Sequence, residues 1–285
     1  MDNNFSLHKT SIDSHIATFL SLNKSGIPTH FYPANGFPSG TYRQFLSSLT
    51  SELCITSLNP RSCWPNIGKP PKQINWEVYA DDLIEFLDQT QNEPIIGMGH
   101  SQGATATIIA ASKRPDLFKQ LVVIEPAYVS MRLSFLLQIL PLFIKEKSQP
   151  LKSAILKQDI FESKTDFINS CRNNRFYKRG SDSVLHDFCE FGLRSKENGR
   201  YTLVFPKNWE ASNFSKPPSI WKYLKKIEIP IILIGGKHTV FFNAKNRELW
   251  LQKSPNTSLV ENLEYGHIFP LEAPEVCADL ILKSI

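Results

Sequence analysis

A serine lies between two glycines in the segment GHSQG at positions 99–103. A short apolar run, 94–98, precedes the segment, and 104–114 follows it without glycine or proline at a spacing that suits a helix. This order predicts a strand, a tight turn and a helix, with glycines where the two backbones come close. Ser101 would then stand at the strand's carboxyl end, beside the free N–H groups of the first helical turn, including that of Gln102. The segment therefore predicts a nucleophilic serine next to donors that suit a developing negative charge.

Gly-x-Ser-x-Gly between a strand and a helix resembles the nucleophile elbow of the α/β-hydrolase superfamily. A serine hydroxyl is a poor nucleophile at neutral pH, so it needs a base within hydrogen-bond reach, and the base needs a carboxylate. The segment GHIFPLEAPE at 266–275 follows the last expected strand, 257–263, and is similar to the family's catalytic-histidine loop. The resemblance implies that His267 is the base that activates Ser101.

The triad carboxylate is missing from the place where most members of the superfamily carry it, after the seventh strand. The corresponding segment, 234–241, reads IGGKHTVF, and no aspartate occurs between Asp187 and Asp279. The cap-bearing branch that includes haloalkane dehalogenases, epoxide hydrolases and some lipases offers a second position, after the sixth strand. Glu125 stands there, directly after the apolar run 120–124, and the resemblance implies that it is the triad acid.

Three alternatives to this acid stay open. In the first two, Glu125 is only a residue of the cap hinge or of a helix start, and the acid is Glu264 or Glu261 near His267. In the third, no carboxylate takes part, and the site is a Ser–His dyad that works more slowly. The nucleophile itself is a further departure, because haloalkane dehalogenases and epoxide hydrolases of this fold attack through an aspartate. Serine at position 101 favours acyl-serine chemistry on an ester, a thioester, an amide or a carbon–carbon acyl bond.

A second turn rich in glycine and proline, ANGFPSG at 34–40, follows an expected strand and precedes an expected helix. The family commonly carries His-Gly-x-Pro in this turn, and this chain has Asn-Gly-Phe-Pro at 35–38. By that match Phe37 would give its backbone N–H to the oxyanion together with Gln102. Asn35 departs from the family pattern, although a backbone donor survives the change. An ordinary turn between strand and helix is the alternative.

Alternating strands and helices must position these residues. Apolar runs typical of buried strands occur after an N-terminal β-ribbon at 5–19, with helical patterns between them; the strands are expected at 29–33, 54–58, 94–98, 120–124, 227–235 and 257–263, and the helices at 41–51, 75–89 and 104–114. This rhythm predicts an α/β fold, the α/β-hydrolase fold by resemblance, with a mostly parallel sheet that is covered on both faces. Sites in such sheets lie at the carboxyl ends of the strands.

About a hundred residues separate the expected sixth and seventh strands, far more than an ordinary connection needs. Their pattern predicts helices at 131–147, 150–159, 165–175, 183–194 and 220–226, with an irregular stretch at 201–214. We expect a helical cap at 128–218, inserted into a core formed by 1–127 and 219–285. The resemblance implies that this cap covers the site. Apolar side chains are expected either to line an acyl pocket or to belong to the core; they are Leu136, Leu137, Ile139, Leu140, Phe143, Phe241, Phe242 and Phe269.

Composition limits the remaining classes of function. The chain has 285 residues, 41% apolar and 21% charged, which indicates an ordinary soluble globular protein rather than disorder or a coiled coil. The net charge of +5 is spread over the chain, so no nucleic-acid partner is expected. No apolar stretch has the length of a spanning helix, so no stable membrane insertion is expected. A polar N-terminus and five scattered cysteines favour reduced thiols in a cytoplasmic protein, without a metal site or a cofactor.

These expectations combine into one function. We expect a serine hydrolase that cleaves a small or medium, apolar carboxylic ester, its small-molecule substrate, through an acyl-serine intermediate. The alternatives are a thioesterase, a hydrolase or lyase of carbon–carbon bonds on the same fold, and a ligand-binding member without catalysis.

Overall fold

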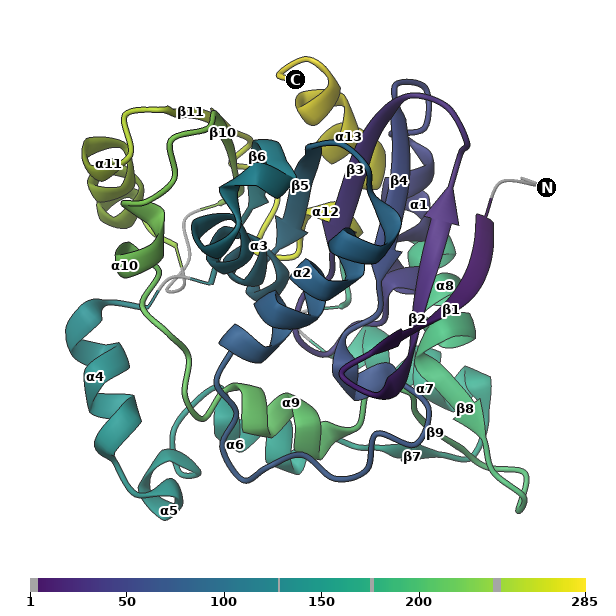
Figure 1. The fold of residues 1–285 in the computed structure, drawn as a ribbon. Coiled ribbons are helices and arrows are strands. Elements are labelled where there is room, and N and C mark those ends of the chain that lie inside the picture. The colour runs from purple at the N-terminus through teal and green to yellow at the C-terminus, as the bar shows by residue number, and fades with distance from the viewer. Residues whose placement is uncertain (1–4, 128, 175–176, 238–241) are drawn as a thin grey trace.

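The structure, a computed structural model, describes residues 5–127, 129–174, 177–237 and 242–285. An eight-stranded sheet forms its centre, with the strand order β1-β2-β4-β3-β5-β6-β10-β11 (Figure 1). The strands are β1 (Phe5–Ile12), β2 (His15–Leu22), β3 (Ile27–Tyr32), β4 (Leu53–Leu58), β5 (Ile95–His100), β6 (Phe118–Ile124), β10 (Ile231–Gly235) and β11 (Thr257–Glu261). β1 and β2 pair antiparallel, as do β2 and β4, and the pairs from β4 to β11 are parallel. The predicted α/β fold with a mostly parallel sheet and an N-terminal ribbon is confirmed.

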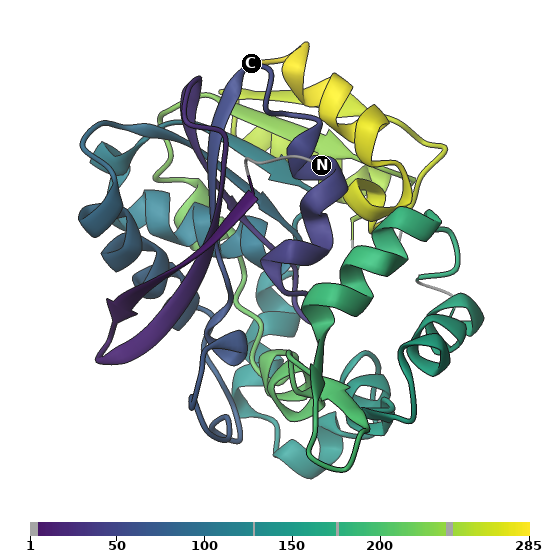
Figure 2. The same cartoon turned by 90° about the vertical axis from the view of Figure 1, so that its right-hand side faces the viewer.

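Both faces of the sheet are covered because its central strands are apolar on both sides. In β6, Leu121 and Val123 pack into one core cluster, whereas Val122 and Ile124 pack into the other. The first cluster lies under α2 (Glu77–Thr90), α3 (Gln102–Lys113), α10 (Trp221–Leu224) and α11 (Ala244–Lys253), and the second under α1 (Arg43–Ser47), α12 (Phe269–Glu272) and α13 (Pro274–Leu282). Figure 2 shows α2 and α3 on one side of the sheet and α1 and α13 on the other. Burial on both faces explains why these strands are continuous apolar runs in the sequence.

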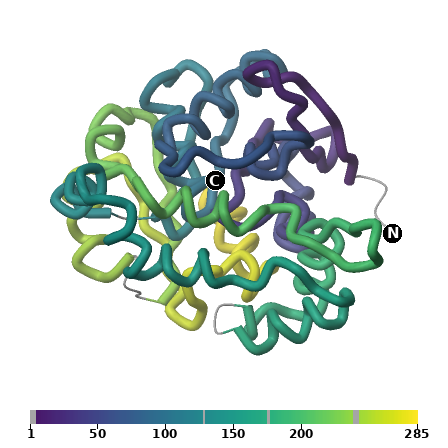
Figure 3. The backbone as a smooth tube through the Cα atoms, turned by 90° about the horizontal axis from the view of Figure 1, so that it is seen from below, coloured from purple at the N-terminus to yellow at the C-terminus, as the bar shows by residue number. Residues whose placement is uncertain are grey.

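The chain between β6 and β10, the sixth and seventh strands of the large sheet, forms what we call the insert, residues 129–218. It holds α4 (Met131–Ile139), α5 (Leu142–Lys145), α6 (Leu151–Leu156), α7 (Lys164–Asn173), α8 (Asp182–Gly192), α9 (Lys207–Asn213) and a small antiparallel sheet of β7 (Ile160–Phe161), β9 (Tyr201–Leu203) and β8 (Leu193–Ser195). Viewed from below in Figure 3, its teal and green chain crosses one end of the molecule. That it is a separate cap domain stays a prediction.

Two expectations for the insert were wrong. The helix expected over 131–147 is divided into α4 and α5 at Pro141, whose ring cannot continue a helix and whose preceding residue, Leu140, is extended. The stretch expected to be irregular, 201–214, holds β9 and α9. The small sheet escaped notice because strands of two or three residues are too short to show an alternating pattern.

Two further observations concern the chain as a whole. None of the helices in the described ranges is both long and apolar enough to cross a membrane. All five cysteines are free thiols, and four of them are buried, namely Cys63, Cys171, Cys189 and Cys277.

Candidate active site

Ser101 occupies the predicted elbow between β5 and α3. Its φ of 52° is a strained conformation for a residue with a side chain, and such strain concentrates at functional sites. A Cβ atom on Gly103 would lie 2.1 Å from the Tyr32 carbonyl oxygen, and one on Gly99 would lie 2.6 Å from the Ala104 nitrogen. Both positions therefore require glycine, because the helix approaches its own strand and β3 too closely for any side chain.

The structure brings the three predicted triad residues into one hydrogen-bonded chain. His267 Nε2 lies 3.0 Å from Ser101 Oγ, and His267 Nδ1 lies 3.2 Å from Glu125 Oε2. An ionised carboxylate only accepts hydrogen bonds, so Nδ1–H of the neutral imidazole donates to Glu125 and Nε2 is free to accept the proton of Ser101. This arrangement is the one that activates a serine for attack on a carbonyl.

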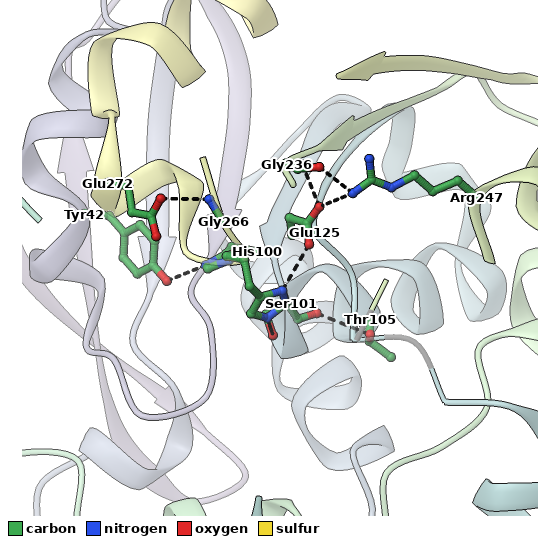
Figure 4. A network of polar contacts seen from close by, with 10 residues as sticks. Tyr42, His100, Ser101, Thr105, Glu125, Gly236, Arg247, Gly266 and Glu272 are labelled. Carbon is green, nitrogen blue, oxygen red and sulfur yellow. Dashed lines mark hydrogen bonds and ion pairs between the residues drawn. The ribbon is translucent and has the colours of Figure 1, made fainter. Parts of the chain in front are cut away.

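Glu125 is completely buried and is held by the turn after β10 (Figure 4). The backbone N–H of Gly236 donates to Glu125 Oε1 at 2.7 Å, and the Arg247 guanidinium donates to the same oxygen at 2.9 Å. Arg247, itself 2% exposed, also pairs with Glu261. One oxygen of the carboxylate is thus occupied by a cation and an amide, which leaves the other oxygen for His267. These partners hold the carboxylate in one orientation.

The turn after β10, which carries no acidic residue of its own, therefore supports Glu125, which follows β6. Gly235 leaves the space that Arg247 fills, since a Cβ there would lie 2.7 Å from the guanidinium, and a Cβ on Gly236 would lie 2.6 Å from the Gly266 carbonyl oxygen. Sequence reasoning missed Arg247, and the signal that was available was the Gly-Gly pair at the empty acid position. The two alternative acids lie elsewhere: Glu261 binds Arg247, and the Glu264 side chain is exposed.

His100, the residue before Ser101, joins two parts of the site. Its Nε2 lies 2.8 Å from the His267 carbonyl oxygen, and its Nδ1 lies 2.8 Å from the Tyr42 hydroxyl. A carbonyl only accepts, so Nε2 carries the proton and Nδ1 accepts from Tyr42 (Figure 4). Burial, together with the neighbouring His267, lowers the pKa of His100 to about 3, which keeps the ring neutral. His100 thereby fixes the backbone of the loop that carries the predicted base.

Lowering the pH from 7 to 5 is expected to reduce the free energy of unfolding by about 2 to 3 kcal/mol. Burial lowers the pKa values of His30 and His100 from 6.5 to about 3, so the unfolded state binds more protons in this range. Each ring then costs about 2 kcal/mol of stability at pH 5. Asp82 acts in the opposite sense, because burial raises its pKa to about 6 and it contributes about 1 kcal/mol at pH 5. Denaturant unfolding at both pH values measures the difference.

The control for this experiment is a histidine on the surface. In the His100→Gln variant, the decrease in the free energy of unfolding between pH 7 and pH 5 is expected to be about 2 kcal/mol smaller than in the wild type. Replacement of the exposed His186 by Gln should leave the pH dependence of this free energy as in the wild type. A stability that is flat or rises between pH 7 and pH 5 in the wild type would contradict the buried, neutral state of the two rings.

The turn predicted to hold the second oxyanion donor lies beside Ser101. The backbone N–H of Gln102 belongs to the first turn of α3, where helical N–H groups lack partners within the helix. The Phe37 N–H donates to the Ala34 carbonyl at 3.2 Å and closes the turn. Donation to an oxyanion would require this bond to be exchanged, and Phe37 stays a predicted donor.

Asn35, the departure from the family pattern, fastens this turn to the insert. Its side-chain amide donates to the Glu210 carbonyl at 3.2 Å, and its oxygen accepts from the Asn213 side chain at 2.8 Å. Glu210 and Asn213 both lie on α9. The insert therefore holds the turn that carries Phe37.

A cavity of about 440 Å³ opens at Ser101 and His267, between the core and the insert. Most of its wall is apolar and comes from both parts of the chain; it includes Ala34, Phe37, Trp76, Ala127, Pro150, Ala154, Leu156, Phe161, Phe167, Phe188, Phe214 and Ile268. Its size is within the ordinary range for small-molecule sites. An ion pair, Lys157 with Glu210 at 2.7 Å, lies in the same wall. Burial alone would lower the pKa of Lys157, but Tyr177 and Glu210 beside it raise that pKa, so the ammonium keeps its charge.

For two of the apolar side chains expected either in an acyl pocket or in the core, the core alternative holds. Phe242 and Phe269 are fully buried in the core, and Phe241 lies outside the described residues. The side chains expected on the first helix of the insert do not line the cavity either, and Leu136, Ile139 and Phe143 are exposed. The spacing of apolar residues predicts that a helix has an apolar face, but it does not predict whether that face lines a cavity, packs on the core or meets the solvent. The expectation for the side chains of this helix was wrong for that reason. Within the described ranges, no cluster of three or more His, Cys, Asp or Glu side chains is arranged to hold a metal ion.

Residues 36–281 match the family described as alpha/beta hydrolase fold. The strand order, the elbow and the covered parallel sheet described above define the same class of protein. The chain therefore belongs to the alpha/beta hydrolase fold family, and the expectation of a hydrolase is confirmed at the level of the family.

Individual relatives are distant. A probable alcohol acetyltransferase from Cyberlindnera fabianii is 22% identical over 236 residues, which cover 74% of this chain and 59% of that protein. The chain thus spans less than two thirds of the length of that relative. The abhydrolase domain-containing protein ACTT2 from Alternaria alternata is also 22% identical, over 68% of this chain and 83% of that protein. The crystal structure of E-2-(acetamidomethylene)succinate hydrolase aligns with a TM-score of 0.80 over 98% of both chains at 16% identity, which shows a shared fold.

Proposed function

We propose that this protein is a serine hydrolase that cleaves a small or medium, apolar carboxylic ester through an acyl-serine intermediate. The observation that carries the proposal is the hydrogen-bonded chain from Ser101 through His267 to Glu125, which opens into a largely apolar cavity. Membership of the alpha/beta hydrolase fold family supports it. The active pocket is then shared by the core and the insert, which acts as the cap, and we keep the cytoplasm as the predicted location.

The proposed reaction has two halves that share one base. Ser101 Oγ attacks the ester carbonyl while His267 Nε2 takes its proton, and Glu125 stabilises the imidazolium that forms. The backbone N–H groups of Phe37 and Gln102 donate to the oxyanion. His267 then delivers the proton to the leaving alkoxide, the carbon–oxygen bond breaks, and the alcohol departs. Water, deprotonated by His267, attacks the acyl-serine, the bond between the acyl carbon and Ser101 Oγ breaks, and His267 returns the proton to Oγ as the carboxylic acid departs.

A chain-length series of p-nitrophenyl esters, from acetate to octanoate, tests this proposal against the Ser101→Ala variant. We expect saturable hydrolysis by the wild type, with kcat/KM rising as the acyl chain fills the apolar wall and falling once it exceeds about 440 Å³ of space. Matching thioesters measured under the same conditions separate an esterase from a thioesterase. Wild-type rates that equal those of the variant on every substrate would contradict the proposal.

Acyl transfer to an alcohol is a second candidate. It is favoured by the relative named a probable alcohol acetyltransferase, since an acyl-serine can be attacked by an alcohol as well as by water. The assay is the same hydrolysis with added ethanol or isoamyl alcohol, with the new ester measured by gas chromatography. Transfer is supported if the new ester exceeds the free acid at alcohol concentrations far below that of water.

A further inference from the structure

The first two helices of the insert expose large apolar side chains to the solvent. Met131, Phe135, Ile139 and Phe143 are 66%, 68%, 63% and 62% exposed. We call residues 131–145 the apolar hairpin. Figure 1 places its helices, α4 and α5, at the outer edge of the molecule, away from the large sheet. Contiguous exposed apolar surface of this kind marks an interaction site rather than ordinary surface.

Two buried polar side chains fasten the apolar hairpin to the rest of the insert, together with Leu142, which packs against a small apolar cluster of Leu151, Ala154 and Ala211. The Ser134 hydroxyl donates to the Pro217 carbonyl at 3.0 Å, and Ser134 is buried. The Lys145 ammonium is buried as well and donates to the carbonyls of Leu137 at 2.8 Å and Ser215 at 2.9 Å. An ordinary surface helix buries its apolar face and exposes its polar one. The apolar hairpin shows the reverse, because the polar side chains of Ser134 and Lys145 are buried while large apolar side chains face the solvent.

The distribution of these side chains favours a lipid surface over a second protein. At about 100° per residue, the exposed apolar positions of α4 spread over about 200° of its circumference, with Leu136 and Leu133 both on one side of the stripe that Met131, Phe135 and Ile139 form. A protein partner covers one face of a helix, whereas the boundary between lipid headgroups and acyl chains surrounds whatever is inserted into it. Three of the four exposed charged residues in 131–156 are basic, Arg132, Lys147 and Lys152. Such flanking cations attract anionic headgroups.

The segment that follows the apolar hairpin in the chain carries a further exposed apolar side chain, which belongs to the cavity of the active site. Leu156, at the end of α6, is 71% exposed and also lines the cavity. Pro150 and Ala154 of the same segment line the cavity as well. A lipid surface that received the apolar hairpin would therefore lie beside an apolar entrance to Ser101.

We propose that residues 131–156 dock reversibly on an anionic lipid surface, with the apolar hairpin entering the boundary between headgroups and acyl chains. The contact is peripheral, since neither helix could span a bilayer. Its purpose is to admit an apolar ester from the lipid to the cavity. Only this purpose rests on the proposed function; the docking itself does not.

Sedimentation with vesicles tests the docking without any activity measurement. Wild-type protein is mixed with vesicles of phosphatidylcholine alone or with phosphatidylglycerol added, at low and high salt. We expect binding to the anionic vesicles that weakens with salt, and at least a tenfold loss of binding in the Phe135→Ser/Ile139→Ser variant. Phe143→Ser alone should change binding in the same direction. The matched control is Leu7→Ser/Ile16→Ser, which removes two exposed apolar side chains from β1 and β2 and should bind like the wild type.

Each other outcome overturns the proposal. These are an absence of sedimentation with anionic vesicles, an equal loss in the control variant, or a dimer in light scattering that Phe135→Ser/Ile139→Ser dissociates. The last result would mean that the apolar hairpin packs against a second copy of this chain. The Ser101→Ala variant should sediment like the wild type, so docking can be confirmed even if the proposed hydrolysis is wrong.

Discussion

The Ser101→Ala variant is expected to lose about 10⁵-fold or more in kcat for the best ester, because no other group can form the acyl intermediate. Its KM should change little, since only the attacking oxygen is removed and the cavity stays intact. The measurement is steady-state hydrolysis together with a burst experiment, in which the wild type releases one equivalent of alcohol rapidly and the variant releases none.

Ser153→Ala is the matched control for this experiment. Ser153 also lines the cavity, but its hydroxyl bonds to Gln149 rather than to a base. We expect its kcat to stay within about twofold of the wild type, as for a surface hydroxyl outside the catalytic chain. A Ser101→Ala enzyme that kept wild-type turnover would mean that Ser101 is not the nucleophile.

Glu125→Gln is expected to lower kcat by about 10³- to 10⁴-fold. The amide keeps the shape of the carboxylate, but it removes the charge that stabilises the imidazolium, and its NH₂ group favours the wrong tautomer of His267. The loss should appear in kcat more than in KM, because Glu125 does not line the cavity. The variant also leaves Arg247 with one carboxylate partner fewer, so thermal unfolding must be measured alongside turnover.

Glu264→Gln distinguishes this assignment from its alternative. Glu264 is close to His267 in the sequence, yet its side chain is exposed, and its replacement should leave turnover unchanged. If Glu264→Gln lost activity and Glu125→Gln kept it, the acid would have to come from the histidine loop. If both variants were fully active, the site would work as a dyad.

The part of this site that the sequence could predict is the part encoded in local backbone geometry. The elbow around Ser101 needs two glycines within five residues, and the loop after the last strand needs a glycine beside His267, so both leave short patterns. Glu125 was found because it follows an apolar run and because the usual position is empty. Each prediction depended on a strand end, and the sheet then placed all three side chains together.

The remaining features depend on contacts between segments far apart in the chain. Arg247 reaches Glu125 across 122 positions, and His100 reaches the backbone of His267 across 167. Nothing in the pattern around either residue indicates its partner. The cavity wall is a similar case, because the amphipathic patterns of α7 and α8 do not tell whether the apolar face of each helix lines a cavity or packs on a core. The exposed face of α4 was misjudged for the same reason.

Labelling with a fluorophosphonate tests the central claim most directly, because the reagent reacts only with a serine that a base has activated. The labelled protein is digested, and the modified peptide is identified by mass spectrometry. We predict one label per chain on Ser101 of the wild type, none on Ser101→Ala, and a rate at least a thousandfold lower for His267→Ala, in line with the loss expected for a missing base. A wild-type protein that stays unlabelled, or that carries the label on another serine, would contradict the account.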